Sequence, residues 1–515
     1  MMTSYSLRPR AAALAAPFAA PFAAALAASL LAACTVGPDY HGAPSVAPDA
    51  ASASTFVRAP ANGIIATAPA PNQWWLALGD PQLNTLIAAA FAHNPDLRAA
   101  QARLRESRAQ LQQQRAAEMP KVSADAAAIR MREPDISAFS SSGSSASSSG
   151  RGPVSFYTAG FDASWEIDLF GGTRRAIEAA DTQSQAVNAD LADAQVSLAA
   201  EVAQAYIDLR DQQQRLIIAQ RTAELQQQSL TLTEQRRAGG TAAEVDVERL
   251  TTQVENTRST ITPLAAQVDI SLDQLAVLTG KAPGALDAEL AQPGALPALP
   301  GTVAIGDPAK MLAQRPDIRA AERRLASSNA QIGEHIADFF PKITLYGDLS
   351  YSAADPGHLF RQSNATWVGA PYLSWNLLDF GRTLGAVHGA EASRDEAIAK
   401  YEKTVLGALQ DANDGLSRFG YQREHLATLE KVQKSALRSA DLTRQRYRAG
   451  TVSLVDLLDT QRAEFSAQQD VIAGQAELLK DYVSLQKSLG LGWQGQQEPQ
   501  AQQQPQPAQP QQPQA

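Results

Sequence analysis

The chain has 515 residues and a formal net charge of −9, with 44 basic and 53 acidic side chains. This acidic balance argues against nucleic-acid partners, because those call for basic patches. One cysteine, six scattered histidines, no glycine-rich phosphate loop and no histidine pair at metal-ligand spacing leave nothing to catalyse with, so we do not expect an enzyme.

Residues 1–33 are typical of an export signal. Two arginines precede an Ala/Leu-rich stretch that ends in Leu31-Ala32-Ala33-Cys34, and small residues before the cysteine fit a cleavage site. The end of this stretch resembles a bacterial lipobox, which implies a covalent acyl lipid on Cys34 and no other cofactor. An ordinary signal peptide with a chance cysteine is the alternative. A transmembrane helix is disfavoured because two prolines interrupt the apolar run.

Residues 34–80 are expected to form an extended tether, being rich in Pro, Ala and Ser up to position 72. Helix begins near Asp80-Pro81, since an acidic N-cap followed by Pro at the first helical position is a start signal. Asn94-Pro95-Asp96 ends this helix and starts a second one, which runs to Met119 before Pro120.

The sequence from Asn94 onward occurs twice. Asn94-Pro95-Asp96-Leu97-Arg98-Ala99-Ala100 returns as Arg315-Pro316-Asp317-Ile318-Arg319-Ala320-Ala321, and Pro120-Lys121 returns as Pro341-Lys342; both pairs are offset by 221. Trp165, Phe170-Gly171, Gly240-Thr241, Asp246 and Gly280 recur at an offset of 210. The difference is an 11-residue insertion, which coincides with the Ser/Gly run 140–150 and is expected to be a solvated loop.

Each copy contains two candidate strands near 121–168 and 342–378. Apolar residues alternate with polar ones, as in Ile343, Leu345 and Leu349. We therefore expect four strands per chain. A soluble two-sheet sandwich remains an alternative.

Long proline-free stretches follow each pair of strands. A helix from Arg174 to Arg236 would be roughly 95 Å long at 1.5 Å per residue, and such helices need lateral packing. Leu458, Phe465, Ile472 and Leu479 recur every seven residues, as do Val471, Leu478 and Leu485. This spacing predicts coiled-coil contact.

These boundaries define the expected domain organisation. Repeat 1 covers 81–280, a Pro/Gly/Ala-rich connector covers 281–308, and repeat 2 covers 309–490. Residues 491–515 are rich in Gln, Pro and Ala and are expected to be disordered.

Four strands are too few to close into a barrel. An open edge in hydrocarbon leaves backbone groups unpaired at several kcal/mol each, and the smallest bacterial barrels have about eight strands. If the strands cross a membrane, several chains must share one barrel, and three chains would supply twelve strands.

Several motifs resemble the TolC/OprM-type outer-membrane factors, within their lipoprotein branch that serves resistance–nodulation–division (RND) efflux pumps. The segments that carry the resemblance are Cys34-Thr35-Val36-Gly37-Pro38-Asp39-Tyr40, Trp74-Trp75, Trp165-Glu166-Ile167-Asp168-Leu169-Phe170-Gly171, Trp375-Asn376-Leu377-Leu378-Asp379-Phe380-Gly381 and Tyr447-Arg448-Ala449-Gly450. They extend over nearly all of the chain from Cys34 to Trp493.

The resemblance implies an α+β membrane protein. Its homotrimer has a twelve-stranded β-barrel in the outer membrane of a Gram-negative bacterium and a twelve-helix α-barrel in the periplasm. It also implies docking to a periplasmic adaptor bound to an inner-membrane RND-type pump. The expected function is a passive exit duct for small molecules. A duct for polypeptide secretion and a periplasmic structural lipoprotein without a pore are the alternatives.

The resemblance also assigns gate residues to the second helix-to-helix turn. It implies that Asp456 and Asp459 point into the lumen, and three chains would gather six carboxylates that attract cations and repel each other. Leu454 and Val455 are expected to add an apolar constriction. The alternative is local, because Ser453 and Asp456 resemble a capping box and the helix dipole favours acids in a first turn.

Three further predictions concern the turns. Tyr447 occupies the position at which relatives tie neighbouring helices shut. Some relatives have an arginine after the Gly-Thr pair that forms a second latch, and this chain has Val452 at that position. The tips expected to contact the adaptor are Gly239, Gly240, Thr241, Gly450 and Thr451, although the glycines are also explained as helix C-caps.

Overall fold

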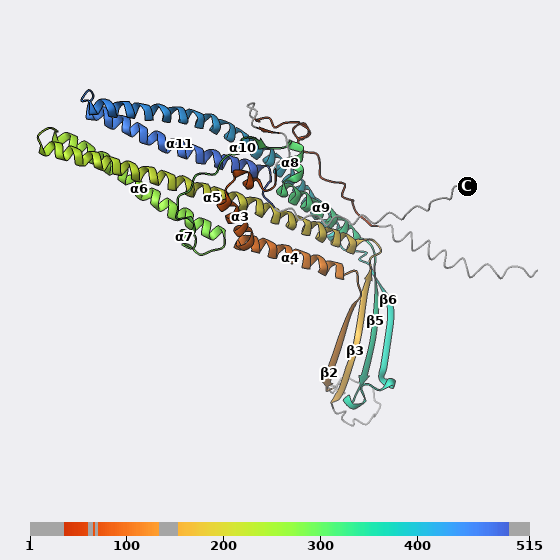
Figure 1. Ribbon diagram of the computed structural model, residues 1–515. Coiled ribbons are helices and arrows are strands. Elements are labelled where there is room, and N and C mark those ends of the chain that lie inside the picture. The colour runs from red at the N-terminus through yellow and green to blue at the C-terminus, as the bar shows by residue number, and fades with distance from the viewer. Residues whose placement is uncertain (1–34, 60–64, 67–70, 133–152, 494–515) are drawn as a thin grey trace, which may run out of the picture. The chain divides into compact units, whose positions relative to one another are not determined.

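The computed structural model describes residues 35–59, 65–66, 71–132 and 153–493 (Figure 1). The predicted signal peptide, Cys34, the Ser/Gly run 140–150 and residues 494–515 lie outside the described residues. Contacts divide the chain into two compact units. Unit 1 comprises the segment up to Ala43, Arg105–Gln185 and Glu322–Ala399, and unit 2 comprises Pro44–Leu104, Ala186–Ala321 and the chain from Lys400. Each unit therefore contains parts of both repeats.

The described helices follow the order expected from the repeat. They are α2 (Pro48–Ala51), α3 (Pro81–His93), α4 (Pro95–Ala116), α5 (Gly172–Ala238), α6 (Glu244–Leu278), α7 (Asp287–Leu290), α8 (Pro308–Gln314), α9 (Pro316–Ala337), α10 (Arg382–Arg448) and α11 (Leu454–Ser488), with short 3-10 helices η1 (Trp74–Leu78), η3 (Pro356–His358) and η4 (Gln362–Asn364). The strands are β1 (Ile65–Ala66), β2 (Lys121–Met131), β3 (Val154–Ile167), β4 (Val303–Ala304), β5 (Lys342–Ala353) and β6 (Ala365–Ser374).

Unit 1 contains one antiparallel sheet in the order β2-β3-β5-β6 (Figure 1). The two hairpins share one register, because Lys121 opposes Ser164 in the first and the corresponding Lys342 opposes Ser374 in the second. The register lines up Phe161, Leu349 and Trp367 across β3, β5 and β6, as the predicted alternation requires. These three side chains are all exposed. A two-sheet sandwich would bury such a row, so that alternative is wrong.

Two tryptophans hold the turns that precede the strands. Trp165 Nε1 donates to the carbonyl of Glu118 at 2.9 Å, and Trp375 Nε1 donates to the carbonyl of Phe339 at the same distance. Both donor and acceptor positions correspond in the two repeats. The repeat is thus preserved in side-chain contacts as well as in sequence.

Unit 2 contains most of the buried apolar residues. Its core brings together side chains of η1, α3, α5, α6, α10 and α11. Trp74 is 1% exposed and packs edge-on against Trp75 and Tyr482, with ring centroids 5.7 and 6.0 Å apart. The prediction that residues 34–80 form an extended tether is therefore wrong for this part, because a buried aromatic pair fixes it to the core.

The long helices confirm the coiled-coil prediction. α5 and α10 each have 67 residues, about 100 Å at 1.5 Å per residue. Along α11, Val471, Leu478 and Leu485 are all buried, as the seven-residue spacing predicted. None of the helices in the described part of the chain combines the length and the apolar character needed to cross a bilayer.

In each repeat, a buried polar side chain near the start donates a hydrogen bond to a backbone carbonyl near the end. Asn94 Nδ2 donates to the carbonyl of Leu278 at 3.0 Å, and Arg315 Nη1 donates to the carbonyl of Ser488, the corresponding position, at 2.6 Å. The repeat therefore conserves the acceptor while the donor changes from an amide to a guanidinium.

The C-terminal boundary of repeat 2 differs from the prediction. Leu491, which was expected in the disordered tail, is 2% exposed within the core of unit 2. The guanidinium of Arg319 also lies 5.9 Å from the centroid of the Trp493 ring. Burial of Leu491 and the contact between Arg319 and Trp493 thus extend the packed part of unit 2 to Trp493.

Candidate functional site

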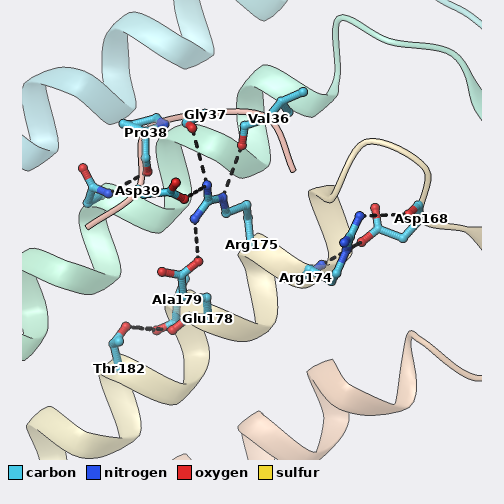
Figure 2. Close-up of polar contacts among 11 residues, drawn as sticks. Val36, Gly37, Pro38, Asp39, Asp168, Arg174, Arg175, Glu178, Ala179 and Thr182 are labelled. Carbon is cyan, nitrogen blue, oxygen red and sulfur yellow. Dashed lines mark hydrogen bonds and ion pairs between the residues drawn. The ribbon is translucent and has the colours of Figure 1, made fainter. Parts of the chain in front are cut away.

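The segment that directly follows Cys34 is bound to the protein surface of unit 1 by Arg175 (Figure 2). This side chain, at the start of α5, is 5% exposed. Its Nε donates to the carbonyl of Val36 at 3.2 Å, and Nη2 donates to the carbonyl of Gly37 at 3.4 Å and to Asp39 Oδ1 at 2.6 Å. Glu178 pairs with Nη1 at 2.8 Å. Two carboxylates thus compensate the charge of this buried cation, while its Nε and Nη2 atoms both donate to the segment after Cys34.

Further contacts extend this attachment. The N–H of Val36 donates to the carbonyl of Phe170 at 3.0 Å, and Asn329 Nδ2 donates to the carbonyl of Pro38 at 2.9 Å. Gly37 has a φ of 92°, and a Cβ there would lie 2.4 Å from the Cα of Gly333. Only glycine allows this approach. The hydrogen bond from Arg175 lowers the pKa of Asp39 below its ordinary value, so this carboxylate stays charged in mildly acidic solution.

We call residues 35–40 the strap. The strap and the core packing of Trp74 and Trp75 fix a segment that composition predicted to be an extended tether. Sequence reasoning missed Arg175 because its partners lie 136 to 139 residues earlier. The repeat could not reveal it either, since the corresponding position in repeat 2 is Gly385.

The two helix-to-helix turns in unit 2 have the same backbone structure. The N–H of Thr241 donates to the carbonyl of Arg236 at 2.8 Å, and the N–H of Thr451 donates to the carbonyl of Arg446 at 2.9 Å. Gly240 and Gly450 have φ values of 73° and 72°. Both turns are glycine C-caps of the Schellman type, which confirms the structural interpretation of these glycines. Nothing in the structure tests adaptor contact at Gly239, Gly240, Thr241, Gly450 and Thr451.

The gate candidate Asp456 is part of a capping box at the start of α11. Its backbone N–H donates to Ser453 Oγ at 3.2 Å, and its Oδ2 accepts from the N–H of Ser453 at 3.1 Å. The hydroxyl of Ser453 also donates to Oδ2, at 2.7 Å. These hydrogen bonds lower the pKa of Asp456. The side chain remains exposed, so a capping role and a lumenal charge are compatible.

Asp459 lies one turn further along α11 and is also exposed. It accepts from Arg462 Nη1 at 3.4 Å. In repeat 1 the corresponding positions hold Asp246 and Arg249, which pair with each other at 3.8 Å. Two carboxylates in repeat 2 therefore correspond to an acid–base pair in repeat 1. At these two positions the second turn therefore has two acids where the first has one acid and one base.

The apolar gate candidates differ from each other. Leu454 is buried in a cluster with Leu230, Leu457 and Leu458, so its predicted place at a constriction is corrected: its side chain packs between helices of one chain. Tyr447 packs against the same cluster and is half-buried. Val455 is 39% exposed. An apolar constriction, if three chains meet here, therefore depends on Val455.

Comparisons with known proteins match nearly the whole chain. A sequence profile described as "Outer membrane efflux protein" matches residues 86–281 and 308–491. The antibiotic efflux pump outer membrane protein ArpC of Pseudomonas putida is 33% identical over 468 residues, which cover 90% of this chain and 93% of that protein. Outer membrane protein OprJ of Pseudomonas aeruginosa is 31% identical over 465 residues, covering 90% and 94%.

Solved structures agree with this similarity. The outer-membrane channel OprN matches with a TM-score of 0.77 and 35% identity, covering 89% of this chain and all of that chain. The MtrE outer membrane channel of Neisseria gonorrhoeae, solved in its open state, matches with a TM-score of 0.73 and 27% identity, covering 89% and 98%.

Proposed function

The chain belongs to the outer membrane efflux protein family, and from this we propose that it is the outer-membrane exit duct of a tripartite efflux pump. The observation that carries the proposal is the match of both repeats to one family of efflux proteins. The relative ArpC is named for antibiotic efflux, which favours small-molecule export over polypeptide secretion. A duct of this kind conducts passively, while a periplasmic adaptor and an inner-membrane pump supply energy and selectivity.

The duct we propose is a homotrimer. One chain contributes four strands. The two outer strands, β2 and β6, each have one unpaired edge among the described strands. Unpaired edges are costly in hydrocarbon. Three chains would give a twelve-stranded barrel, and their long helices would form a twelve-helix periplasmic tunnel. The exposed apolar row of Phe161, Leu349 and Trp367 supports a lipid-facing surface.

Lipid anchoring at Cys34 is part of the same proposal. A Cβ on Gly171 would lie 2.7 Å from the side chain of Thr35, the residue next to Cys34. Gly171 follows β3 by four residues. The strap would therefore hold the acyl group close to the end of a membrane strand, where it can enter the lipid.

The gate proposal concerns Asp456 and Asp459. Three chains would bring six carboxylates around one axis, and the exposed side chains and the lowered pKa of Asp456 support a charged ring at neutral pH. The six carboxylates would repel each other, so we infer that cations bound between them keep the resting duct largely closed. We expect purified trimers in planar bilayers to show low conductance that rises several-fold when both residues are replaced by Ala.

Repeat 1 supplies a matched control for this measurement. Asp246→Ala removes the corresponding acid from the other turn and should leave the conductance unchanged. An equal rise in Asp246→Ala would mean that loosened helix starts, rather than the charged ring, open the duct. Unchanged currents in the double variant would refute the gate and leave the duct itself standing.

A further inference from the structure

The repeat predicts how the two outer edges of the four-stranded sheet pair with neighbouring subunits. Within the chain, the first hairpin meets the second where β3 pairs with β5, and Trp165 opposes Leu345 there. By the sequence offsets, β6 is the repeat-2 counterpart of β3, and β2 is the repeat-1 counterpart of β5. The contact between repeats inside one chain is therefore a template for the contact between chains.

We propose that β6 of one subunit pairs with β2 of the next in the register of β3 and β5, an inference that rests on the proposed trimeric duct. The internal pair Asp162 and Asp348 then predicts that Tyr372 opposes Ala127 of the partner subunit. The internal pair Trp165 and Leu345 predicts that Trp375 opposes Ala124 of the partner subunit.

The end of β6 supports this register. β3 continues through Trp165 to Ile167, and these residues pair only with β5, since β2 begins opposite Ser164. β6 stops at Ser374. Trp375 to Leu377 correspond to the last three residues of β3 but have no neighbouring strand among the described residues. In the proposed register, residues 122–124 of the partner subunit pair with them and extend β6.

The direction of the side chains is also consistent. In this register the apolar face that carries Trp367 and Leu373 continues onto the face of the partner's β2 that carries Val122 and Ala124. A slip of one residue would turn the partner's Asp125 and Ser123 to the lipid side, which strongly disfavours it. Slips of two residues keep the faces aligned and are the alternatives to test.

A loop contact follows from the same correspondence. Phe170, which follows β3, stacks on Phe340, which precedes β5, with centroids 4.5 Å apart. The counterparts are Phe380, which follows β6, and Met119, which precedes β2. Phe380 is 99% exposed with an unfavourable φ of 53°, and Met119 is 68% exposed. The register brings Phe380 to Met119 of the partner subunit, a favourable sulfur–aromatic pair.

Cysteine cross-linking tests the register in outer membranes that contain the full chain. Tyr372→Cys with Ala127→Cys should give covalent oligomers on oxidation. Within a chain the two positions are three strand spacings apart, about 14 Å sideways. They are also displaced along the strands, since Tyr372 is level with Glu166 of β3 and Ala127 is level with Thr158. Their separation therefore exceeds the roughly 7 Å limit for a disulfide between Cα atoms. Tyr372→Cys combined with Asp125→Cys or with Ile129→Cys reports the two-residue slips on the same face.

The expected result is at least tenfold more covalent oligomer for the Tyr372 and Ala127 pair than for either slipped pair. If a slipped pair cross-links better, or if no pair cross-links although native mass measurement shows trimers, the register is wrong and the duct proposal stands. If the protein is also monomeric in the membrane extract, the trimer itself fails.

Discussion

At the residue scale, Arg175 shows how a buried charge can organise a whole segment. Its guanidinium is compensated by Asp39 and Glu178 and also donates to two backbone carbonyls of the strap. The guanidinium is 5% exposed whereas Asp39 is largely exposed, so loss of an acid would leave a desolvated cation with less compensation. Arg175 therefore binds three residues of the strap, Val36, Gly37 and Asp39.

We expect Arg175→Gln to release the strap. Hydrogen bonds to charged groups contribute about 1.5–3 kcal/mol each, so amide hydrogen exchange of Val36, which donates to Phe170, should accelerate at least tenfold. Arg174→Gln is the control, because Arg174 contacts Asp168 and does not touch the strap. Unchanged exchange in Arg175→Gln, measured by mass spectrometry on the N-terminal peptide, would contradict this role.

At the element scale, the two tips show which turn features are backbone requirements. Gly239 and Gly240 are adjacent, yet only Gly240 has a positive φ. A Cβ on Gly239 would meet its nearest neighbour, the carbonyl oxygen of Arg236, at an ordinary 3.6 Å. The first turn therefore requires glycine at position 240, whereas another residue would be tolerated at position 239.

This difference gives a paired test. Gly240→Ala forces a side chain into the left-handed region and should destabilise the tip by about 1 kcal/mol. Gly239→Ala should be neutral. Hydrogen exchange of the Arg236–Asp246 amides should therefore rise about fivefold only in the Gly240 variant. Equal rates in the two variants would show that the tip does not depend on this C-cap.

At the same scale, proline is an unreliable signal for the end of a helix. Not every proline ends a helix in this chain, because α6 runs through Pro263 to Leu278. A proline inside a helix removes one hydrogen bond and crowds the preceding turn. The surrounding residues nevertheless remain helical, since Leu272 and Leu275 near the end of α6 are buried in the core of unit 2.

At the scale of the whole molecule, a half-buried acid on a long helix makes stability depend on pH. Burial, aided by Glu477, raises the pKa of Asp481 on α11 to about 6, against opposing effects of Arg418 and Lys480. A raised pKa means that the folded state binds the proton more tightly than the unfolded chain. The resulting stability is present below about pH 4 and is lost as the pH rises through about 6.

Asp481→Asn removes this dependence at one site. We expect the variant to unfold at a higher temperature than the parent at pH 7.5, where Asp481 must be charged, and at the same temperature near pH 4. Thermal unfolding at both pH values checks this. A midpoint that rises equally at the two pH values would assign the gain to packing and not to titration.

The sequence alone predicted the long helices, the strand faces and the repeat, because each produces a local or periodic pattern of residues. Seven-residue spacing predicted the packed rows of α11, alternation predicted the strand faces, and Asn94-Pro95 and Gly450 marked helix ends. The repeat itself is readable because corresponding positions, such as Trp165 and Trp375, keep the same contacts.

Only the tertiary structure decided where the N-terminal segment lies and which gate candidates face outward. Thr35 to Asp39 have no periodicity, and their position is set by Arg175, far along the chain. Leu454 and Val455 are adjacent apolar residues that sequence could not distinguish, yet one is buried among four helices and the other is exposed. Side-chain direction on a helix depends on what packs against it, and that information is not local.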